Sequence, residues 1–263
     1  MQLLTLDQWG GGRQLNYGID SNLPNGVFRI LGGSQAGNPD LDPWRSSNYD
    51  ASLEYYAGRS TLVSVAYFYI NVTSFIVNGS ATVCNLPDSD GTVRNHCVSI
   101  TGPIQGAGAG LHGGEFDIQQ AFTFLPGFWS GFGAEANFTY SPSNTGTDMA
   151  AHAIPFQDNS AEQANLILYF QNSRLQARVA GNYRSKRAVS QNFGGITGLE
   201  EYQAPTLYLD ASASYNLTPQ VALYLEGTNL TNEYEKYYLV WPSQVADTTH
   251  YERRYSIGVR ASF

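Results

Sequence analysis

The sequence predicts an all-β chain that forms an antiparallel up-and-down transmembrane β-barrel, or part of one. Three observations predict this fold. Extended segments carry apolar residues at every second position, the period of a strand with one oily and one aqueous face. The connections between these segments alternate between short and long, as they do when tight turns occupy one rim of a barrel and loops the other. No run approaches the roughly 18 to 20 apolar residues that a membrane helix needs.

Composition agrees with strands and turns and excludes some partners. The 263 residues include 27 Gly and 18 Tyr, which favours strands joined by turns over helices. The net charge of -8 argues against a phosphate-binding surface, so nucleic acid is not an expected partner. The mean hydropathy of -0.27 is compatible with a membrane barrel, because every second residue of such a strand faces water.

The chain divides into two predicted parts. Residues 1–47 are predicted to be an N-terminal loop region that can hold one weak hairpin from Arg13 to Leu31, because Gly, Asn, Pro and Asp clusters dominate there. Residues 48–263 are predicted to be the barrel segment, and regular alternation begins at Asn48. The expected strands are 48–57, 61–76, 115–124, 131–140, 160–170, 174–184, 206–216, 221–230 and 251–263. The long connections 77–112, 141–158, 185–204 and 231–250 are expected to be loops.

Charged residues occupy the polar positions of these strands. In a barrel such positions face the lumen, where charges stay hydrated and can pair with each other or with a plug. The charges predicted to face the lumen are Glu115, Asp117, Glu135, Arg178, Arg184, Asp210, Glu226, Arg254 and Arg260.

The last strand ends on a phenylalanine. Tyr255, Ile257, Val259 and Phe263 share its apolar face. This strand is similar to the final strand of bacterial outer-membrane barrels, and the resemblance implies that these four residues form the signal that the barrel assembly machinery recognises. The alternative for this segment alone is the edge strand of a soluble β-sandwich.

Cys84 and Cys97 are the only cysteines, and both lie in the long connection that follows the second predicted strand. We expect them to form a disulfide that orders an outer loop in an oxidising compartment, with two free thiols as the alternative.

Aromatic residues in the last long connection are candidate ligand contacts. Trp241, Tyr237 and Tyr238 could stack on a sugar ring. An interfacial girdle or loop packing explains the same residues without a ligand.

Signals for catalysis are weak. The segment Gly108–Gly113 matches a dinucleotide fingerprint, but a strand rather than a helix follows it. The four His residues lie in different segments without metal-ligand spacing. We therefore expect no enzyme activity, no metal and no cofactor.

Two stretches resemble a known family. Gly37-Asn-Pro-Asp-Leu-Asp-Pro-Trp and the residues that follow it to Tyr56 resemble a segment of TonB-dependent outer-membrane receptors. Leu223-Tyr-Leu-Glu-Gly-Thr-Asn-Leu-Thr-Asn-Glu-Tyr234 is similar to the penultimate-strand motif of the same receptors. Both occur in the family's order ahead of the terminal Phe strand.

The resemblance implies a function and a location. Such receptors are plugged barrels of about 22 strands in the outer membrane of Gram-negative bacteria, and they import a scarce small-molecule nutrient with energy from the TonB complex. The Asn-Pro-Asp-Leu-x-Pro-Trp form favours a carbohydrate over a siderophore. Because no signal peptide, TonB box or plug is recognisable, we expect a C-terminal fragment of about nine or ten strands whose TonB contact would need the missing plug.

Two other classes of function remain open at this stage. One is a small self-contained outer-membrane barrel that acts as a pore or adhesin. The other is a soluble secreted β-domain that binds sugar.

Overall fold

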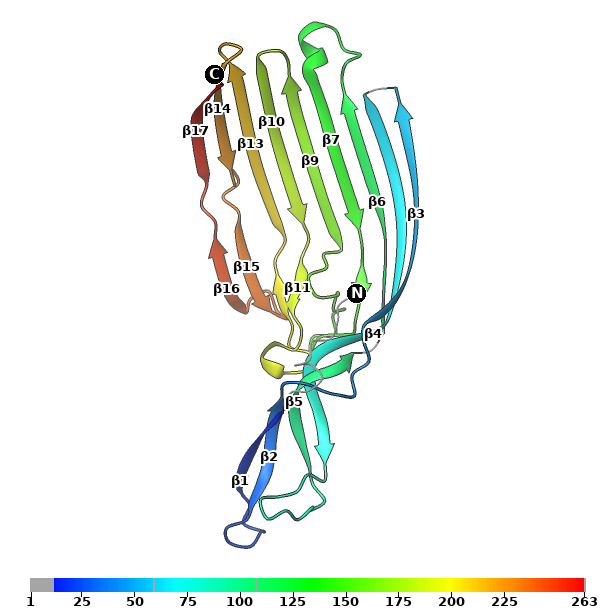
Figure 1. The fold of residues 1–263 in the computed structure, drawn as a ribbon, viewed down its shortest axis with the longest axis vertical. Helices are drawn as coiled ribbons and strands as arrows, with labels where there is room; N and C mark the ends of the chain where they lie inside the picture. Colours follow the sequence, from blue (N-terminus) through cyan, green and yellow to red (C-terminus); the bar gives the residue numbers. More distant parts are fainter. Residues whose placement is uncertain (1–11, 59, 107, 263) are drawn as a thin grey trace.

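The computed structural model describes residues 12–58, 60–106 and 108–262, and the expected signal residue Phe263 lies outside this part. A tall curved sheet forms a wall, and a narrow arm projects from one end of it (Figure 1). A smaller sheet continues the wall on the side of the arm. No helix in the described residues could cross a membrane.

The wall consists of strands in which each pairs antiparallel with the next. Short turns join its strands at the end that carries the carboxyl terminus, and long connections join them at the end that carries the arm (Figure 1). This confirms the predicted alternation of connections. The nine strands are β3 (Arg45–Ala57), β4 (Thr61–Cys84), β6 (Ala109–Ala121), β7 (Phe132–Tyr140), β9 (Glu162–Gln171), β10 (Leu175–Arg184), β13 (Thr206–Asn216), β14 (Val221–Thr228) and β17 (Arg254–Ala261).

The wall is open, because among the described residues β3 and β17 each pair with only one wall strand. This arrangement does not support a small self-contained barrel. It agrees with the expected arc of a larger one.

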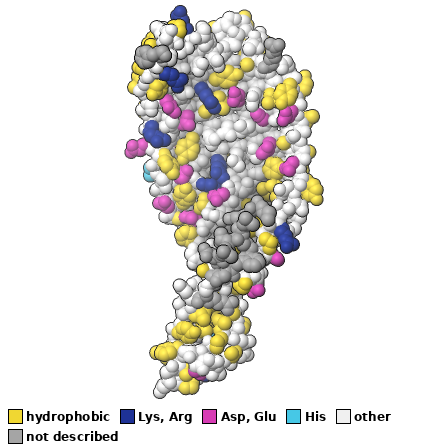
Figure 2. Space-filling model, viewed as in Figure 1, with side chains coloured by type: hydrophobic (Ala, Val, Ile, Leu, Met, Phe, Trp, Pro, Cys, Tyr) yellow, Lys and Arg dark blue, Asp and Glu magenta, His cyan; other side chains and the backbone are white. Residues whose placement is uncertain are grey.

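Register places polar residues of successive strands on one face of the wall. Asp117 lies opposite Asn137, which lies opposite Asn165, which in turn lies opposite Asn182. The Asn165 side chain donates a hydrogen bond to the Asn137 amide oxygen at 2.8 Å, and Asn182 donates to that of Asn165. Directly opposed residues share a face, so this amide row of three asparagines crosses three strands on a single side, with Asp117 beside it on a fourth. Figure 2 shows acidic and basic side chains spread over one side of the wall.

The other face of the wall is apolar and exposed. Leu53 on β3 is 75% exposed and Ile257 on β17 is 83% exposed. Between these edges, Val65, Leu168 and Leu225 lie on the same face and are also exposed. A soluble protein rarely exposes so continuous an apolar surface, and a membrane barrel requires one.

On the polar face, aromatic rings lie over glycines of the neighbouring strand. A Cβ built on Gly133 would lie 2.1 Å from the ring of Tyr169, and one built on Gly258 would lie 2.2 Å from the ring of Tyr224. The absence of a side chain at the glycine lets the ring lie flat against the wall. Three directly opposed pairs have this form: Phe68 with Gly113, Tyr169 with Gly133, and Tyr224 with Gly258.

The arm contains β1 (Arg13–Ile19), β2 (Phe28–Gln35), β5 (Cys97–Gly106) and the second half of β4. Ile30, Val98 and Ile100 form its buried core, separate from the wall. A disulfide joins Cys84 to Cys97, which face each other at the end of the β4–β5 ladder. The arm is therefore a small unit with its own core.

Two predicted loops, 77–112 and 231–250, are largely strand, and a third, 185–204, contains two short strands, so those expectations were wrong. The connection 77–112 contains the end of β4 and all of β5. The connections 185–204 and 231–250 supply the smaller sheet, ordered β11-β12-β15-β16. Its bounds are β11 (Arg187–Ser190), β12 (Glu201–Gln203), β15 (Tyr234–Leu239) and β16 (Val245–His250). The remaining elements are β8 (Ser143–Asn144) and two 3₁₀ turns, η1 (Gly127–Gly131) and η2 (Phe193–Gly195). These strands were missed because the strands of the smaller sheet are short, and because β5 carries Gly102, Pro103 and Gly106, which weaken the strand pattern.

We expect Gly113→Ala to destabilise the wall. The new Cβ would lie 2.2 Å from the backbone oxygen of Tyr140 and 2.6 Å from the Phe68 ring, and backbone cannot move aside easily. Overpacking of this kind costs about 1–3 kcal/mol. Gly114→Ala is the matched control, since its nearest neighbour is 3.6 Å away. Urea unfolding of the detergent-solubilised chain, followed by tryptophan fluorescence, compares the two. Equal midpoints would contradict the close-packing argument.

The double variant Cys84→Ser/Cys97→Ser should loosen the arm without loosening the wall. The cysteines are separated by 13 residues, and a crosslink of this span contributes about 3 kcal/mol. Hydrogen exchange measured by mass spectrometry should become faster in residues 77–104. Peptides from β9 and β10 should keep their protection, because the arm has its own core. Equal loss of protection in both regions would show that arm and wall unfold together.

Candidate functional site: a cavity between the wall and the arm

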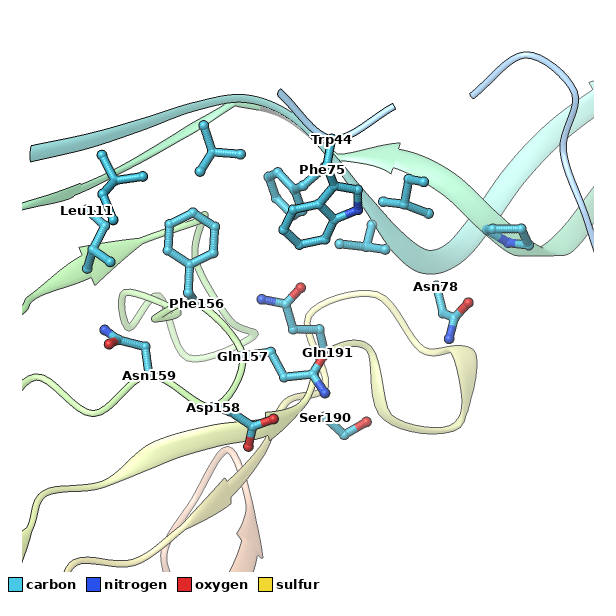
Figure 3. Close-up of a pocket in the computed structure, with 15 residues that line it drawn as sticks. Trp44, Phe75, Asn78, Leu111, Phe156, Gln157, Asp158, Asn159, Ser190 and Gln191 are labelled. Carbon is cyan, nitrogen blue, oxygen red and sulfur yellow. The ribbon is translucent and has the colours of Figure 1, made fainter. Parts of the chain in front are cut away.

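A cavity of about 850 Å³ lies where the arm leaves the wall (Figure 3). Its volume is within the range of about 300–1,000 Å³ that small-molecule sites occupy. Segments distant in sequence meet around it, namely β4, the loop that precedes β9, and the end of β11. The lining residues are Trp44, Ile70, Val72, Phe75, Ile76, Val77, Asn78, Pro103, Leu111, Phe156, Gln157, Asp158, Asn159, Ser190 and Gln191.

One side of the cavity is aromatic. The Trp44 and Phe75 rings meet edge to face at 5.9 Å, and Phe156 meets Phe75 in the same way at 5.8 Å. Phe75 is buried in a cluster with Val72 and Ala109, which fixes it at the centre of the row. The row therefore presents firmly held apolar surface to a ligand.

The opposite side is polar, and Figure 3 shows Gln157 and Gln191 facing the aromatic row. Gln157 donates through Nε2 to the Val189 carbonyl at 3.1 Å, and Gln191 donates through Nε2 to Thr145 Oγ1 at 3.3 Å. Because each amide is anchored through its nitrogen, its oxygen remains available as an acceptor.

A salt bridge stiffens the polar side. Asp158 Oδ1 lies 3.0 Å from Arg187 Nη1, and Arg184 donates to the Asp158 backbone oxygen. Asp158 adopts a φ of 63°, which places it in the left-handed region. The two arginines hold this turn in place. The side-chain amides of Gln157 and Asn159, on either side of Asp158, are therefore positioned before any ligand binds.

A buried acidic cluster supports the loops that lie beyond the cavity. Asp148 accepts hydrogen bonds from the backbone N–H of His152 and from the Tyr202 hydroxyl. Burial opposes its ionisation, but the hydrogen bonds from His152 and Ala150 outweigh burial and lower the pKa of Asp148. Glu200 is buried near it with one carboxylate oxygen unpartnered, and burial raises the pKa of Glu200.

The three aromatic residues predicted to contact a ligand do not line this cavity. Tyr238 is only 7% exposed and stacks on Tyr202 at 5.7 Å, so its ring belongs to the core of the smaller sheet. Tyr237 is its neighbour on β15 and therefore faces the other way, with its hydroxyl donating to Glu235 at 2.6 Å. The two tyrosine rings therefore lie on opposite faces of β15. Trp241 is 41% exposed at the β15–β16 turn.

Register places all nine charges predicted to face the lumen on the same side of the wall as the amide row. Glu135, Arg178 and Glu226 border a shallow depression of about 530 Å³ there, together with Tyr169 and Tyr224. Tyr255, Ile257 and Val259 lie on the opposite, apolar side of β17.

The second stretch that resembles a receptor motif organises the junction of the wall and the smaller sheet. The Asn229 backbone N–H donates to Asp210 at 2.8 Å. Its side chain donates to the carbonyls of Glu233 and Tyr251 and accepts from the Glu233 N–H at 2.7 Å. With a φ of 53°, Asn229 turns the chain after β14 and ties it to the start of β17.

Sequence reasoning missed the residues that form the cavity. Trp44 lay within the stretch that resembles a receptor segment, and Phe75 lay in the expected strand 61–76. Their function as a joint surface depends on the fold of the arm, which turns β4 away from β6 after Val72. No local pattern in the sequence carries that information.

Comparison with known proteins agrees with this architecture. Residues 10–230 match the family model described as TonB dependent receptor-like, beta-barrel. No curated protein matches the sequence.

Among solved structures, the chain is similar to the ferric enterobactin receptor PfeA of Pseudomonas aeruginosa, with a TM-score of 0.60, 16% identity, and coverage of 89% of this chain and 33% of that one. It is also similar to the siderophore receptor PirA of Acinetobacter baumannii, with a TM-score of 0.58, 15% identity, and coverage of 95% and 35%. The copper transporter OprC gives a TM-score of 0.57 at 14% identity, with coverage of 87% and 32%.

The chain thus spans about a third of the length of these solved structures. The predicted fold class is confirmed as part of an antiparallel up-and-down transmembrane barrel, and the soluble sandwich is excluded. The chain belongs to the TonB-dependent receptor-like β-barrel family.

Proposed function

We propose that this chain forms part of the wall of an outer-membrane receptor that takes up a scarce nutrient with energy from the TonB complex. The observation that supports this proposal most is the match of residues 10–230 to the receptor family. The wall also has one charged face and one apolar face, as a membrane barrel requires. The apolar face would lie against lipid of the outer membrane of a Gram-negative bacterium.

The nine charges on the polar face would line the lumen in this proposal. A plug domain occupies the lumen in receptors of this kind, and it would pair with these charges and carry the contact with TonB. Tyr255, Ile257 and Val259 lie on the other face, and together with the terminal residue Phe263 of the sequence they would form the signal for the barrel assembly machinery.

We propose a carbohydrate as the ligand of the cavity beside the arm. A sugar ring has an apolar C–H face that stacks on aromatic rings, and its hydroxyls hydrogen-bond to amide oxygens. The row of Trp44, Phe75 and Phe156 opposite Gln157 and Gln191 supplies both. Trp241, exposed on a separate turn, is a second candidate contact. The solved structures named for siderophores or copper share the fold at 14–16% identity, which leaves the ligand of this chain open.

Deletion of the coding sequence in the bacterium that encodes it tests the uptake function. We expect slower growth when oligosaccharides are the limiting carbon source, restored by the intact gene and unchanged on monosaccharides. A defect confined to iron limitation would refute the carbohydrate proposal but retain uptake. Normal growth under both limitations would refute uptake itself. Immunodetection in the outer-membrane fraction tests the location independently.

Trp44→Ala should weaken binding of oligosaccharides by about two- to tenfold, since one aromatic contact contributes about 0.5–1.5 kcal/mol and 1.4 kcal/mol is a factor of ten. Calorimetry on the detergent-solubilised chain, with malto- and xylo-oligosaccharides and a ferric catecholate as probes, measures this loss. Trp129→Ala is the matched control, because it removes an exposed tryptophan at the short-turn rim outside the cavity, and Trp241→Ala tests the second candidate contact. Loss of binding in Trp241→Ala alone would move the site to the β15–β16 turn. Tight binding of the catecholate alone would refute a carbohydrate site.

A further inference from the structure

The apolar face of the wall contains a further cavity, which the proposed uptake function does not use. A groove of about 460 Å³ crosses strands β7 to β17 on the side that faces lipid. Its floor consists of small residues, namely Ala177, Ala211, Ala213 and Gly227. In the register Ala177 lies opposite Ala213, and Ala211 lies opposite Gly227, so the four form one continuous low patch.

Large side chains border this floor at both ends. Phe132 and Phe170 stand at the β7–β9 end with ring centroids 4.9 Å apart. Leu225 and Tyr255 stand at the β14–β17 end, and the Leu230 side chain packs over Gly227. The charged residues Arg178 and Glu226 contribute to the groove, but they alternate with Ala177 and Leu225 and so direct their side chains to the polar face. The open surface of the groove is therefore mainly apolar, and the Tyr255 hydroxyl is the polar group on it.

An aromatic cluster joins the groove to the rim that carries the short turns. Phe128 and Trp129 lie in the η1 turn, and both are mostly exposed. Trp129 stacks on Phe132 at 5.6 Å, and Phe128 lies 4.7 Å from Phe170. Aromatic residues of this kind sit at the level of lipid headgroups. The groove thus begins at the membrane interface and continues into the wall.

The dimensions suit one lipid chain. From β7 to β17 the groove crosses five interstrand spacings, about 24 Å at 4.8 Å each. Barrel strands tilt by about 45°, so a line across them rises through roughly half of the 30 Å hydrocarbon layer, which is one leaflet. Inside a membrane, lipid tails are as apolar as leucine, so van der Waals contact and shape decide what binds.

We propose that this groove is a specific binding site for an acyl chain of a phospholipid in the leaflet at the short-turn rim. The groove is continuous with the surface that the membrane covers, and this continuity identifies the occupant as lipid rather than protein. The phospholipid headgroup lies beside Trp129, and the chain fills the space above the four small residues. The proposal depends on the membrane wall and is independent of the transported ligand.

Native mass spectrometry of the detergent-solubilised chain, titrated with phosphatidylethanolamine, tests the site. We expect one phospholipid to be retained with saturable affinity. Ala213→Leu should lower that affinity at least tenfold, because leucine fills the floor. The matched control is Ala136→Leu, which makes the same change on the same face outside the groove and should leave binding unchanged. Adducts that increase without saturation, or equal affinity in both variants, would overturn the proposal.

Photo-crosslinking of the wild-type chain gives a second readout. It needs no substitution, so a folding defect in a variant cannot affect the result. A phospholipid with a diazirine on its acyl chain should attach mainly to residues 168–179 and 211–230, with attachment suppressed by unlabelled phospholipid. Adducts spread evenly to exposed outer residues such as Val65 and Leu53 would show ordinary membrane contact and refute a specific site. Suppression by detergent monomer at the same concentration would reduce the groove to an unspecific apolar surface and would equally refute it.

Discussion

Backbone pairing between neighbouring strands is the constraint on which the structure depends. Hydrocarbon offers no partner for N–H and C=O groups, and each unpaired group costs several kcal/mol there. From β4 to β14, every wall strand has an antiparallel neighbour on each side. This continuous ladder fixes the register, and the register decides which side chains face water and which face lipid. The amide row, the nine charges on the same face and the groove on the apolar face all follow from the same pairing.

The wall could be predicted from sequence because it obeys a simple rule. One face of each strand meets water and the other meets hydrocarbon, so residues alternate over long stretches, as in Leu175–Arg184. The short turns, such as the one between β13 and β14, interrupt the pattern only briefly. Beyond the membrane the rule ends, because neither face of a strand there meets lipid. The β5 strand and the strands of the smaller sheet carry Gly, Pro, Thr and Gln at positions that the wall would fill with apolar residues, and they were taken for loops.

The candidate site was less predictable than the fold for a related reason. The cavity forms where β4 leaves β6 and continues into the arm, so its walls come from residues more than a hundred positions apart, such as Trp44 and Gln191. Local patterns report which face a residue occupies and cannot report which distant segment it meets. Tyr237 and Tyr238 on β15 show the same limit. Their rings lie on opposite faces of the strand, and the Tyr238 ring is buried in the core of the smaller sheet against Tyr202. Asn229 is the exception, since a motif resemblance located a residue with several specific hydrogen bonds.

The aromatic rings that lie over glycines solve a problem that alternation leaves unsolved. A register shift of one residue would move the polar side chains of a strand to the lipid face and its apolar side chains to the polar face, which is unfavourable in a membrane. A slip of two residues keeps every face correct, so hydrophobicity alone does not oppose it. Such a slip would set Tyr224 opposite Ser256 or Arg260 instead of Gly258 and leave a bare glycine elsewhere on the seam. Similar aromatic–glycine pairs occur between β4 and β6 and between β7 and β9. Together these pairs favour the observed register over a register shifted by two residues.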